Sequence, residues 1–244
     1  MSLTTTDVVV IGGGVIGTAA AYFLAKCRMD VTLIERGGIA CGTSGRCEGN
    51  VLVQDKLPGF DCQLARLSQE LFPVIAQEID TDIEWIRKGS LLVIESEEEL
   101  DAAAVFCRQM AAEGLPVRML DAHEVHEDEP NLASDIVGGL EFACDGALNP
   151  MAQRAIRFFP VIRQIQIIRN YAGLRPYTPD HFPIVSETRV PGFYVAAGHE
   201  GDGIGLSLIT GKLMAQIMTR EPTDISIEPL RLDRFEGRTL QNHG

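Results

Sequence analysis

The chain has 244 residues, of which 45% are hydrophobic and 23% are charged. This length and composition are typical of a globular protein with one large or two small domains. The formal net charge of -13 at pH 7 disfavours DNA or RNA as a partner, because binding to phosphate backbones depends on clustered Lys and Arg.

The N-terminal segment has the order strand, glycine turn, helix, strand. DVVVIGGG (7–14) is a continuous apolar run that ends in glycines, which is typical of a strand buried on both faces. Residues 15–30 have small and apolar side chains at helical spacing, and VTLIER (31–36) is a second apolar strand. This order predicts a right-handed β-α-β unit and hence an α/β fold with a parallel sheet.

The middle of the chain predicts mixed helices and strands. After a loop at 37–52, residues 61–79 have leucines and isoleucines three and four positions apart, as in an amphipathic helix. KGSLLVIES (88–96) predicts a strand, and residues 97–114 predict a helix with acidic residues in its first turn and Gly114 at its end. IVGGLEFACDGALNP (136–150) indicates two short extended segments around a turn.

The last third contains a second strand-glycine-helix corner. A strand at 193–197 leads into GHEGDGIG (198–205), and a helix is expected to follow. Ile204, Leu208, Leu213 and Ile217 lie on one side of that helix.

No segment of the sequence indicates a membrane, a leader or a metal. The first residues, MSLTTTD, lead directly into a strand, and no apolar run approaches the roughly 18 residues that cross a bilayer. The six cysteines form no CxxC pair and no spacing with histidines that predicts zinc or haem. We therefore expect a cytoplasmic protein with reduced thiols, no transmembrane segment and no metal site.

Gly12, Gly14 and Gly17 fit the G-x-G-x-x-G pattern of dinucleotide-binding turns. The first glycine permits a tight turn, the second lets the backbone approach a pyrophosphate, and the third lets helix and strand pack closely. Glu35, at the end of the next strand, is placed to accept hydrogen bonds from the adenosine ribose. Arg36 follows, but the preceding carboxylate would repel a 2′-phosphate, so a dinucleotide without that phosphate is favoured. The turn alone leaves FAD and NAD as alternatives.

Three further segments complete a resemblance to a known family. GTSGRCEGN (42–50), AGLRPYTPD (172–180) and FYVAAGHEGDGIGLSLITG (193–211) follow DVVVIGGGVIG in the order and spacing of the FAD-dependent D-amino-acid oxidase family. The chain most resembles its branch of glycine oxidases, sarcosine oxidases and amino-acid dehydrogenase β-subunits. The resemblance covers both ends of the chain and implies FAD in a Rossmann-like domain of the glutathione-reductase type.

The resemblance implies that both glycine corners bind FAD. The loop at 43–50 would pass beside the pyrophosphate and the flavin ring, and residues 198–204 would cover the pyrimidine edge of the ring. A helix N-terminus there would stabilise the negative charge of reduced flavin. The expected FAD-binding residues are Gly12, Gly14, Val15, Ile16, Gly17, Glu35, Arg36, Thr43, Ser44, Gly49, Asn50, Gly198, His199, Gly201, Asp202, Gly203 and Ile204.

Arg175 matches the family position whose guanidinium holds the substrate carboxylate. A planar guanidinium grips both carboxylate oxygens and so places the α carbon before the flavin. His199 lies inside the second glycine corner, where an imidazole satisfied by backbone hydrogen bonds is favoured over one that tunes the flavin or carries protons. Tyr177 and Asp180 are candidates for supporting Arg175. Hydride transfer needs a neutral amine more than a base, so no catalytic base is assigned.

The family has a further FAD-contacting strand and a long antiparallel substrate sheet that we do not find here. We expect a discontinuous FAD-binding domain at 1–80 and 170–244, a remnant of the substrate region at 81–150, and a junction with a helix at 151–169. The antiparallel substrate domain is thus reduced or missing, with the join near 151–155. Two interpretations stay open: a true internal deletion, or a segment omitted from the numbering.

The resemblance implies an FAD-dependent oxidase or dehydrogenase. It would oxidise the C–N bond of a small amino acid or secondary amine by hydride transfer to flavin N5, giving an imine. Electrons would pass to oxygen or to a partner protein, in which case the chain is one subunit of a hetero-oligomer. The alternatives are a non-catalytic flavin-binding subunit and an NAD-dependent dehydrogenase.

Overall fold

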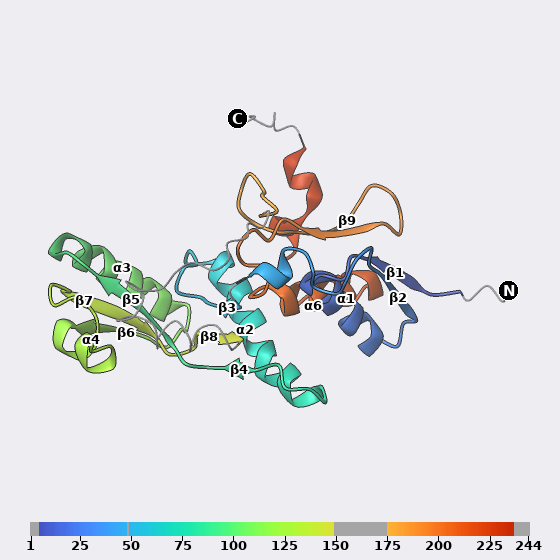
Figure 1. The fold of residues 1–244 in the computed structure, drawn as a ribbon. Helices are drawn as coiled ribbons and strands as arrows, with labels where there is room; N and C mark the ends of the chain where they lie inside the picture. The colour runs from blue at the N-terminus through green and yellow to red at the C-terminus, as the bar shows by residue number, and fades with distance from the viewer. Residues whose placement is uncertain (1–4, 48, 149–174, 237–244) are drawn as a thin grey trace. The chain divides into compact units, whose positions relative to one another are not determined.

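The computed structural model describes residues 5–47, 49–148 and 175–236 (Figure 1). The chain divides into two compact units. The first unit contains Met1–Cys47 and Asn170–Gly244, and the second contains Glu48–Arg169. The first unit therefore takes its residues from both ends of the sequence.

The boundary after Cys47 lies earlier in the chain than residue 80, where the sequence predicted the first part of the FAD-binding domain to end. Helix α2 (Phe60–Glu78) is responsible for the difference. The side-chain amide of Gln69, on this helix, donates to the Val51 carbonyl and to the Asp145 carboxylate, both in the second unit. Residues 49–80 consequently pack with the middle of the chain.

The first unit begins with the predicted β-α-β arrangement. Strand β1 (Val8–Ile11) leads into helix α1 (Val15–Lys26) and strand β2 (Val31–Ile34). The two strands are parallel and in register along their whole length. The short apolar runs of the sequence form these strands because their β-branched side chains suit a pleated surface.

The prediction that β1 is buried on both faces is wrong. A Cβ placed on Gly17 of α1 would lie 3.4 Å from Val10, so alternate residues of β1 face this helix. Val9 and Ile11 lie on the opposite face and are 49% and 81% exposed, and Ile34 of β2 is 52% exposed. Among the described residues the sheet has only these two strands, and this apolar face is left open.

The C-terminal part of the first unit packs against its beginning. Strands β9 (Ile184–Glu187) and β10 (Tyr194–Ala197) form an antiparallel pair and lead to helix α6 (Ser207–Thr219). Short 3₁₀ turns η3 (Glu228–Leu230) and η4 (Leu232–Phe235) follow. Figure 1 shows α6 beside α1, the orange and blue helices.

The contact between α1 and α6 depends on a small residue. A Cβ added to Gly211 would lie 2.6 Å from the Ala19 carbonyl carbon, so the two backbones approach as closely as glycine permits. Leu24, Ile209 and Leu213 are fully buried in the same unit. The predicted apolar face therefore holds for Leu213, while Ile204 precedes the helix.

The described part of the second unit, residues 49–148, contains two antiparallel sheets and three helices. One sheet has the strand order β3 (Asn50–Val51), β8 (Gly146–Leu148) and β4 (Trp85–Ile86). The other sheet has the strand order β5 (Ser90–Ile94), β7 (Gly138–Phe142) and β6 (Val117–Asp121). Helices α2, α3 (Glu97–Ala112) and α4 (Ala122–Asp128) complete it. The predicted helices at 61–79 and 97–114 and the strand at 88–96 are confirmed. No helix of the described residues is long and apolar enough to cross a membrane.

A buried carboxylate joins these elements. Asp145, between β7 and β8, is fully buried. Its Oδ1 accepts from the Val53 amide at 2.8 Å and from Gln69 Nε2 at 3.0 Å, and its Oδ2 accepts from Ser90 Oγ at 2.6 Å and from the Gln54 amide at 3.4 Å. Burial raises the pKa of this carboxyl, and the four hydrogen bonds oppose that shift. One side chain thus connects α2, β5 and the segment after β3.

Candidate cofactor and substrate site

The first glycine turn has the backbone that its sequence predicts. Gly12 adopts φ +111°, in the region that favours glycine. A Cβ on Gly17 would lie 2.0 Å from the Gly12 carbonyl oxygen, so any larger residue there would push the start of α1 away from β1. Gly14 is the N-cap residue of α1 and Val15 its first residue. The turn and the helix start are therefore placed together by the absence of side chains.

The N-terminus of α1 is suited to an anion. Ser44 Oγ accepts from the Val15 amide at 3.0 Å and so caps the helix from the second loop. The amides of Ile16 and Gly17 follow at the end where the helix dipole favours negative charge. Thr43 directly precedes Ser44 and the 3₁₀ turn η1 (Ser44–Arg46). These residues fit the pyrophosphate of a dinucleotide.

Glu35 lies beside the same turn. Its carboxylate oxygens accept from the Gly13 and Gly37 amides, each at 2.8 Å, and these two bonds lower the pKa of the carboxyl. Each oxygen keeps a further lone pair, so an ionised Glu35 retains the capacity to accept from ribose hydroxyls. Arg36 is exposed. The predicted roles of Glu35 and Arg36 toward the cofactor stay predictions.

The second glycine corner lies next to the first. Gly198 ends β10 with φ +78°, and a turn closed by the Asp202 amide and the His199 carbonyl, 2.8 Å apart, leads through Gly203 toward α6. The Cys47 thiol, at the end of the Ser44 loop, contacts the Gly201 carbonyl at 4.0 Å. Segments more than 150 positions apart in the chain thus meet. That both of them bind the cofactor stays a prediction.

His199 is turned into the protein. Its side chain is buried, and Nε2 lies 2.9 Å from Thr210 Oγ1 of α6. Burial lowers the pKa of His199 to about 4, so the ring is neutral at pH 7. The expectation of a hydrogen-bonded histidine holds, although the partner described here is a side-chain hydroxyl and not the backbone. This placement favours support of the turn over proton transfer at its surface.

Arg175 lies against the second glycine corner. A Cβ on Gly201 would be 3.3 Å from the Arg175 guanidinium carbon, which shows how closely the two residues approach. The guanidinium is exposed, and no acidic residue within the described segments forms an ion pair with it. The amide of Glu200 donates to the Pro176 carbonyl at 3.2 Å, and Gly198 is packed against Thr178. The segment that carries Arg175 is therefore held through Pro176 and Thr178, and the exposed guanidinium lies against Gly201.

The two residues considered as support for Arg175 have other contacts. Asp180 accepts from Arg234 Nε at 2.7 Å and Nη2 at 3.1 Å. Burial would raise the pKa of Asp180, but the bonds from Arg234 and from the Phe182 amide outweigh burial and lower it. Tyr177 is exposed and lies edge-on to the His181 ring. Asp180 thus anchors the segment to η4 and is committed to Arg234.

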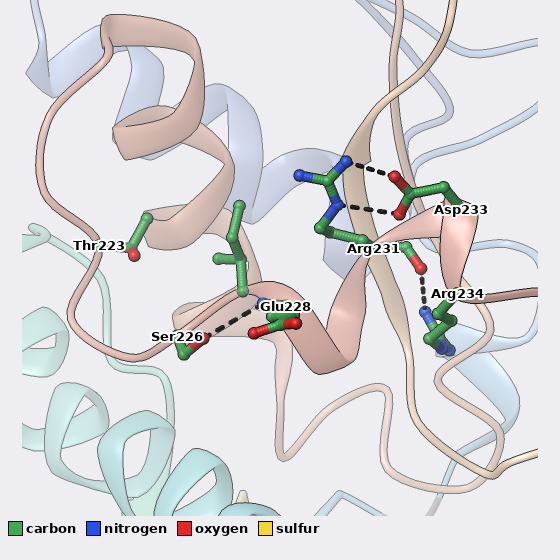
Figure 2. Close-up of a pocket in the computed structure, with 7 residues that line it drawn as sticks. Thr223, Ser226, Glu228, Arg231, Asp233 and Arg234 are labelled. Atoms are coloured by element: carbon green, nitrogen blue, oxygen red, sulfur yellow. Dashed lines mark hydrogen bonds and ion pairs between the residues drawn. The ribbon is translucent and has the colours of Figure 1, made fainter.

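A hollow near the C-terminal 3₁₀ turns contains none of the predicted site residues (Figure 2). It is lined by Thr223, Ser226, Ile227, Glu228, Arg231, Asp233 and Arg234. In Figure 2 the Arg231 guanidinium pairs with both oxygens of Asp233, with Nε 2.9 Å from Oδ1. Arg231 and Asp233 thus pair within the hollow, whereas Arg234 pairs with Asp180, which does not line it.

Gly49 and Asn50 belong to the second unit. Gly49 adopts φ +77°, and Asn50 pairs with Ala147 between β3 and β8. Their expected contact with the flavin stays a prediction. The junction predicted at 151–169 lies outside the described residues.

The sequence also matches a known protein family. It corresponds to the family of FAD dependent oxidoreductases called DAO over residues 7–153 and 149–217. These segments include most of the chain, which therefore belongs to this family and is an oxidoreductase that uses FAD. The Rossmann-like α/β fold expected for the family is confirmed.

Known relatives agree with this assignment. Glycine oxidase of Geobacillus kaustophilus (strain HTA426) is 22% identical to the chain, in an alignment that covers 95% of the chain and 98% of the relative. The crystal structure of that species' glycine oxidase superposes with a TM-score of 0.83 over 94% of this chain and 98% of the other, which shows a shared fold. D-amino acid dehydrogenase of Paramagnetospirillum magneticum (strain ATCC 700264 / AMB-1) is 33% identical over 36% of this chain and 22% of its own length.

The matches also have an internal discontinuity. The alignment with the glycine oxidase is 368 positions long, whereas this chain has 244 residues. The two segments that match the family meet at residues 149–153. Part of the relative therefore has no counterpart in this chain.

Proposed function

We propose that the chain oxidises the C–N bond of a small amino acid or secondary amine to an imine. The observation that carries the proposal is the exposed guanidinium of Arg175, which lies against Gly201 in the turn expected to cover the flavin. The names of two relatives, a glycine oxidase and a D-amino acid dehydrogenase, support an amino acid as substrate. Oxygen or a partner protein would accept the electrons.

Each site residue has a defined task in this proposal. FAD, when bound, supplies the acceptor for the hydride that leaves the substrate's α carbon. Arg175 binds the substrate carboxylate through two parallel N–H bonds and orients the α carbon. The amine loses its proton to solvent as the C=N bond forms. Ser44 and the N-terminus of α1 hold the pyrophosphate, and the buried, neutral His199 keeps the second turn in place.

The test is anaerobic mixing of the purified yellow protein with glycine, sarcosine, proline and D-amino acids. We expect one of these substrates to bleach the flavin absorbance. Arg175→Ala should raise the substrate concentration for half-maximal bleaching at least 100-fold, because a bidentate charge-assisted contact is lost. Arg189→Ala, which removes an exposed arginine paired with Glu236, is the matched control and should behave as wild type. Equal bleaching by Arg175→Ala would contradict the assignment of the carboxylate contact.

A second candidate is a flavin-binding subunit without catalysis of its own. The discontinuity of the matches near residues 149–153 favours it, because the part of the relative without a counterpart is expected to include the wall of the substrate pocket. The apolar face of β1 and β2, which no described residue covers, agrees with a missing neighbour. If the purified protein contains FAD and no amine bleaches its flavin absorbance, this alternative is supported. The intact mass, measured beside the visible spectrum, would establish whether the 244-residue chain itself carries the flavin.

A further inference from the structure

Glu200 connects the two segments that bring Arg175 to the glycine corner. It lies between His199 and Gly201, in the turn after β10. Its backbone amide donates to the Pro176 carbonyl at 3.2 Å, so it contacts the residue that directly follows Arg175. No feature of the sequence alone distinguishes this glutamate from a solvated acidic residue.

The carboxylate of Glu200 has two donors on the same segment. Oε1 lies 3.0 Å from His181 Nδ1 and 3.4 Å from the Thr178 amide. The side chain of Glu200 is 22% exposed, so these contacts are partly shielded from water. Because backbone and side chain both bind residues 176–181, the loop that carries Arg175 is joined to the turn at three points.

The backbone of Glu200 supports a specific role. Its φ of +46° lies in the left-handed region, which is unfavourable for a residue with a Cβ. Glycine would avoid this cost, as Gly198 does nearby at φ +78°. A glutamate at such a position indicates that its side-chain contacts offset the strain.

We propose that Glu200 is a positioning residue, which holds the Pro176–His181 segment so that the Arg175 guanidinium stays over Gly201 to receive a carboxylate. This inference rests on the proposed function, in which Arg175 binds the substrate carboxylate. Glu200 itself touches neither the substrate nor the flavin in this scheme. Its effect is to reduce the number of positions that the arginine samples before the ligand binds.

The experiment measures acetate binding to the FAD-loaded protein by calorimetry and by the flavin difference spectrum. Glu200→Gly removes the carboxylate and also relieves the backbone strain, so the variant should fold with near-native stability. We expect it to weaken acetate binding about 10-fold. Glu200→Gln keeps an acceptor oxygen for the Thr178 amide and should bind acetate within about 2-fold of wild type. Glu236→Ala removes an exposed carboxylate paired with Arg189 and is the matched control.

The outcomes separate this inference from the proposed function. If Arg175→Ala abolishes acetate binding while Glu200→Gly binds as wild type, the positioning role is wrong and the carboxylate contact of Arg175 stands. If Arg175→Ala binds as wild type, or the wild-type protein binds no acetate, both proposals fail. Rescue by Glu200→Gln distinguishes positioning from a loss of folding, because a destabilised turn would weaken both variants.

Discussion

The replacement of Asp145 by alanine tests what holds the second unit together. Its carboxylate is fully buried and accepts four hydrogen bonds from separate parts of that unit. Asp145→Ala leaves the Val53 and Gln54 amides and the Ser90 hydroxyl without this acceptor, while Gln69 Nε2 keeps only the Val51 carbonyl. Asp145→Asn keeps the shape and one carbonyl oxygen.

The expected cost follows from the number of orphaned donors. Each buried donor without a partner costs about 1–3 kcal/mol, and removal of a buried charge recovers part of the total. We therefore expect Asp145→Ala to lower the free energy of unfolding by about 3–4 kcal/mol. Asparagine can accept from Val53 and Gln69 and donate to the Ser90 hydroxyl, so only the long bond from Gln54 lacks an acceptor. Its expected cost is about 1–2 kcal/mol.

The fluorescence of Trp85 reports the unfolding of the second unit, which also contains Asp145. It is the single tryptophan of the chain, and its ring stacks on Phe72 with centroids 5.0 Å apart. Urea unfolding of the flavin-free protein, followed through Trp85, should show a lower midpoint at an unchanged slope. An Asp145→Ala protein within about 1 kcal/mol of wild type would refute the view that these hydrogen bonds stabilise the unit.

Acidity gives a second measurement on the same residue. Because burial raises the pKa of Asp145 above its ordinary 3.8, the folded protein keeps a proton that the unfolded chain has lost. The contribution of Asp145 to the free energy of unfolding is therefore fully present below pH 3.8, and it is lost as the pH rises through the raised pKa. Asparagine does not titrate, so the stability of wild type relative to Asp145→Asn should fall with rising pH in this range. A constant or rising difference would contradict the shift.

Two further changes test the first unit. Gly17→Ala places a Cβ 2.0 Å from a backbone oxygen and should lower the thermal midpoint and the flavin content. Gly42→Ala, with nothing within 4 Å of its Cβ, is the control and should leave both unchanged. Equal behaviour of the two variants would contradict the packing argument. Asp180→Ala removes the bidentate contact of Arg234 and should lower the free energy of unfolding by about 2–3 kcal/mol at pH 7. Asp233→Ala breaks an exposed ion pair and should leave the thermal midpoint near that of wild type. Because the pKa of Asp180 is lowered, its contribution is present above pH 3.8 and should be lost as the pH falls further, which acid titration of wild type and Asp180→Ala would show.

Local patterns were sufficient to predict most of the helices and strands. The glycine spacing of the first turn predicted its geometry, because a Cβ on Gly17 has no room whatever the rest of the fold. The acidic first turn and Gly114 bounded α3 in the same way. The boundary at residue 80 was not predictable, because the contacts of Gln69 with Val51 and Asp145 join residues that are distant in sequence.

The supporting residues of the site also required the fold. Glu200 and Thr210 have no pattern that separates them from ordinary surface and helix residues. Their roles depend on partners, His181 and His199, that only the folded chain brings within 3.0 Å and 2.9 Å. A glutamate seven residues before the start of α6 carries no such information by itself.

The sequence by itself predicted a dinucleotide, because the glycine turn after β1 and the acidic residue after β2 act through local geometry. The contribution of both chain ends to one cofactor site is what the family resemblance implied. The tertiary structure alone decided which side chains meet. It placed Ser44 on the start of α1, Cys47 beside Gly201, and the exposed tip of Arg175 over the second turn. The members of each pair are distant in the sequence, so the spacing of residues along the chain does not reveal these contacts.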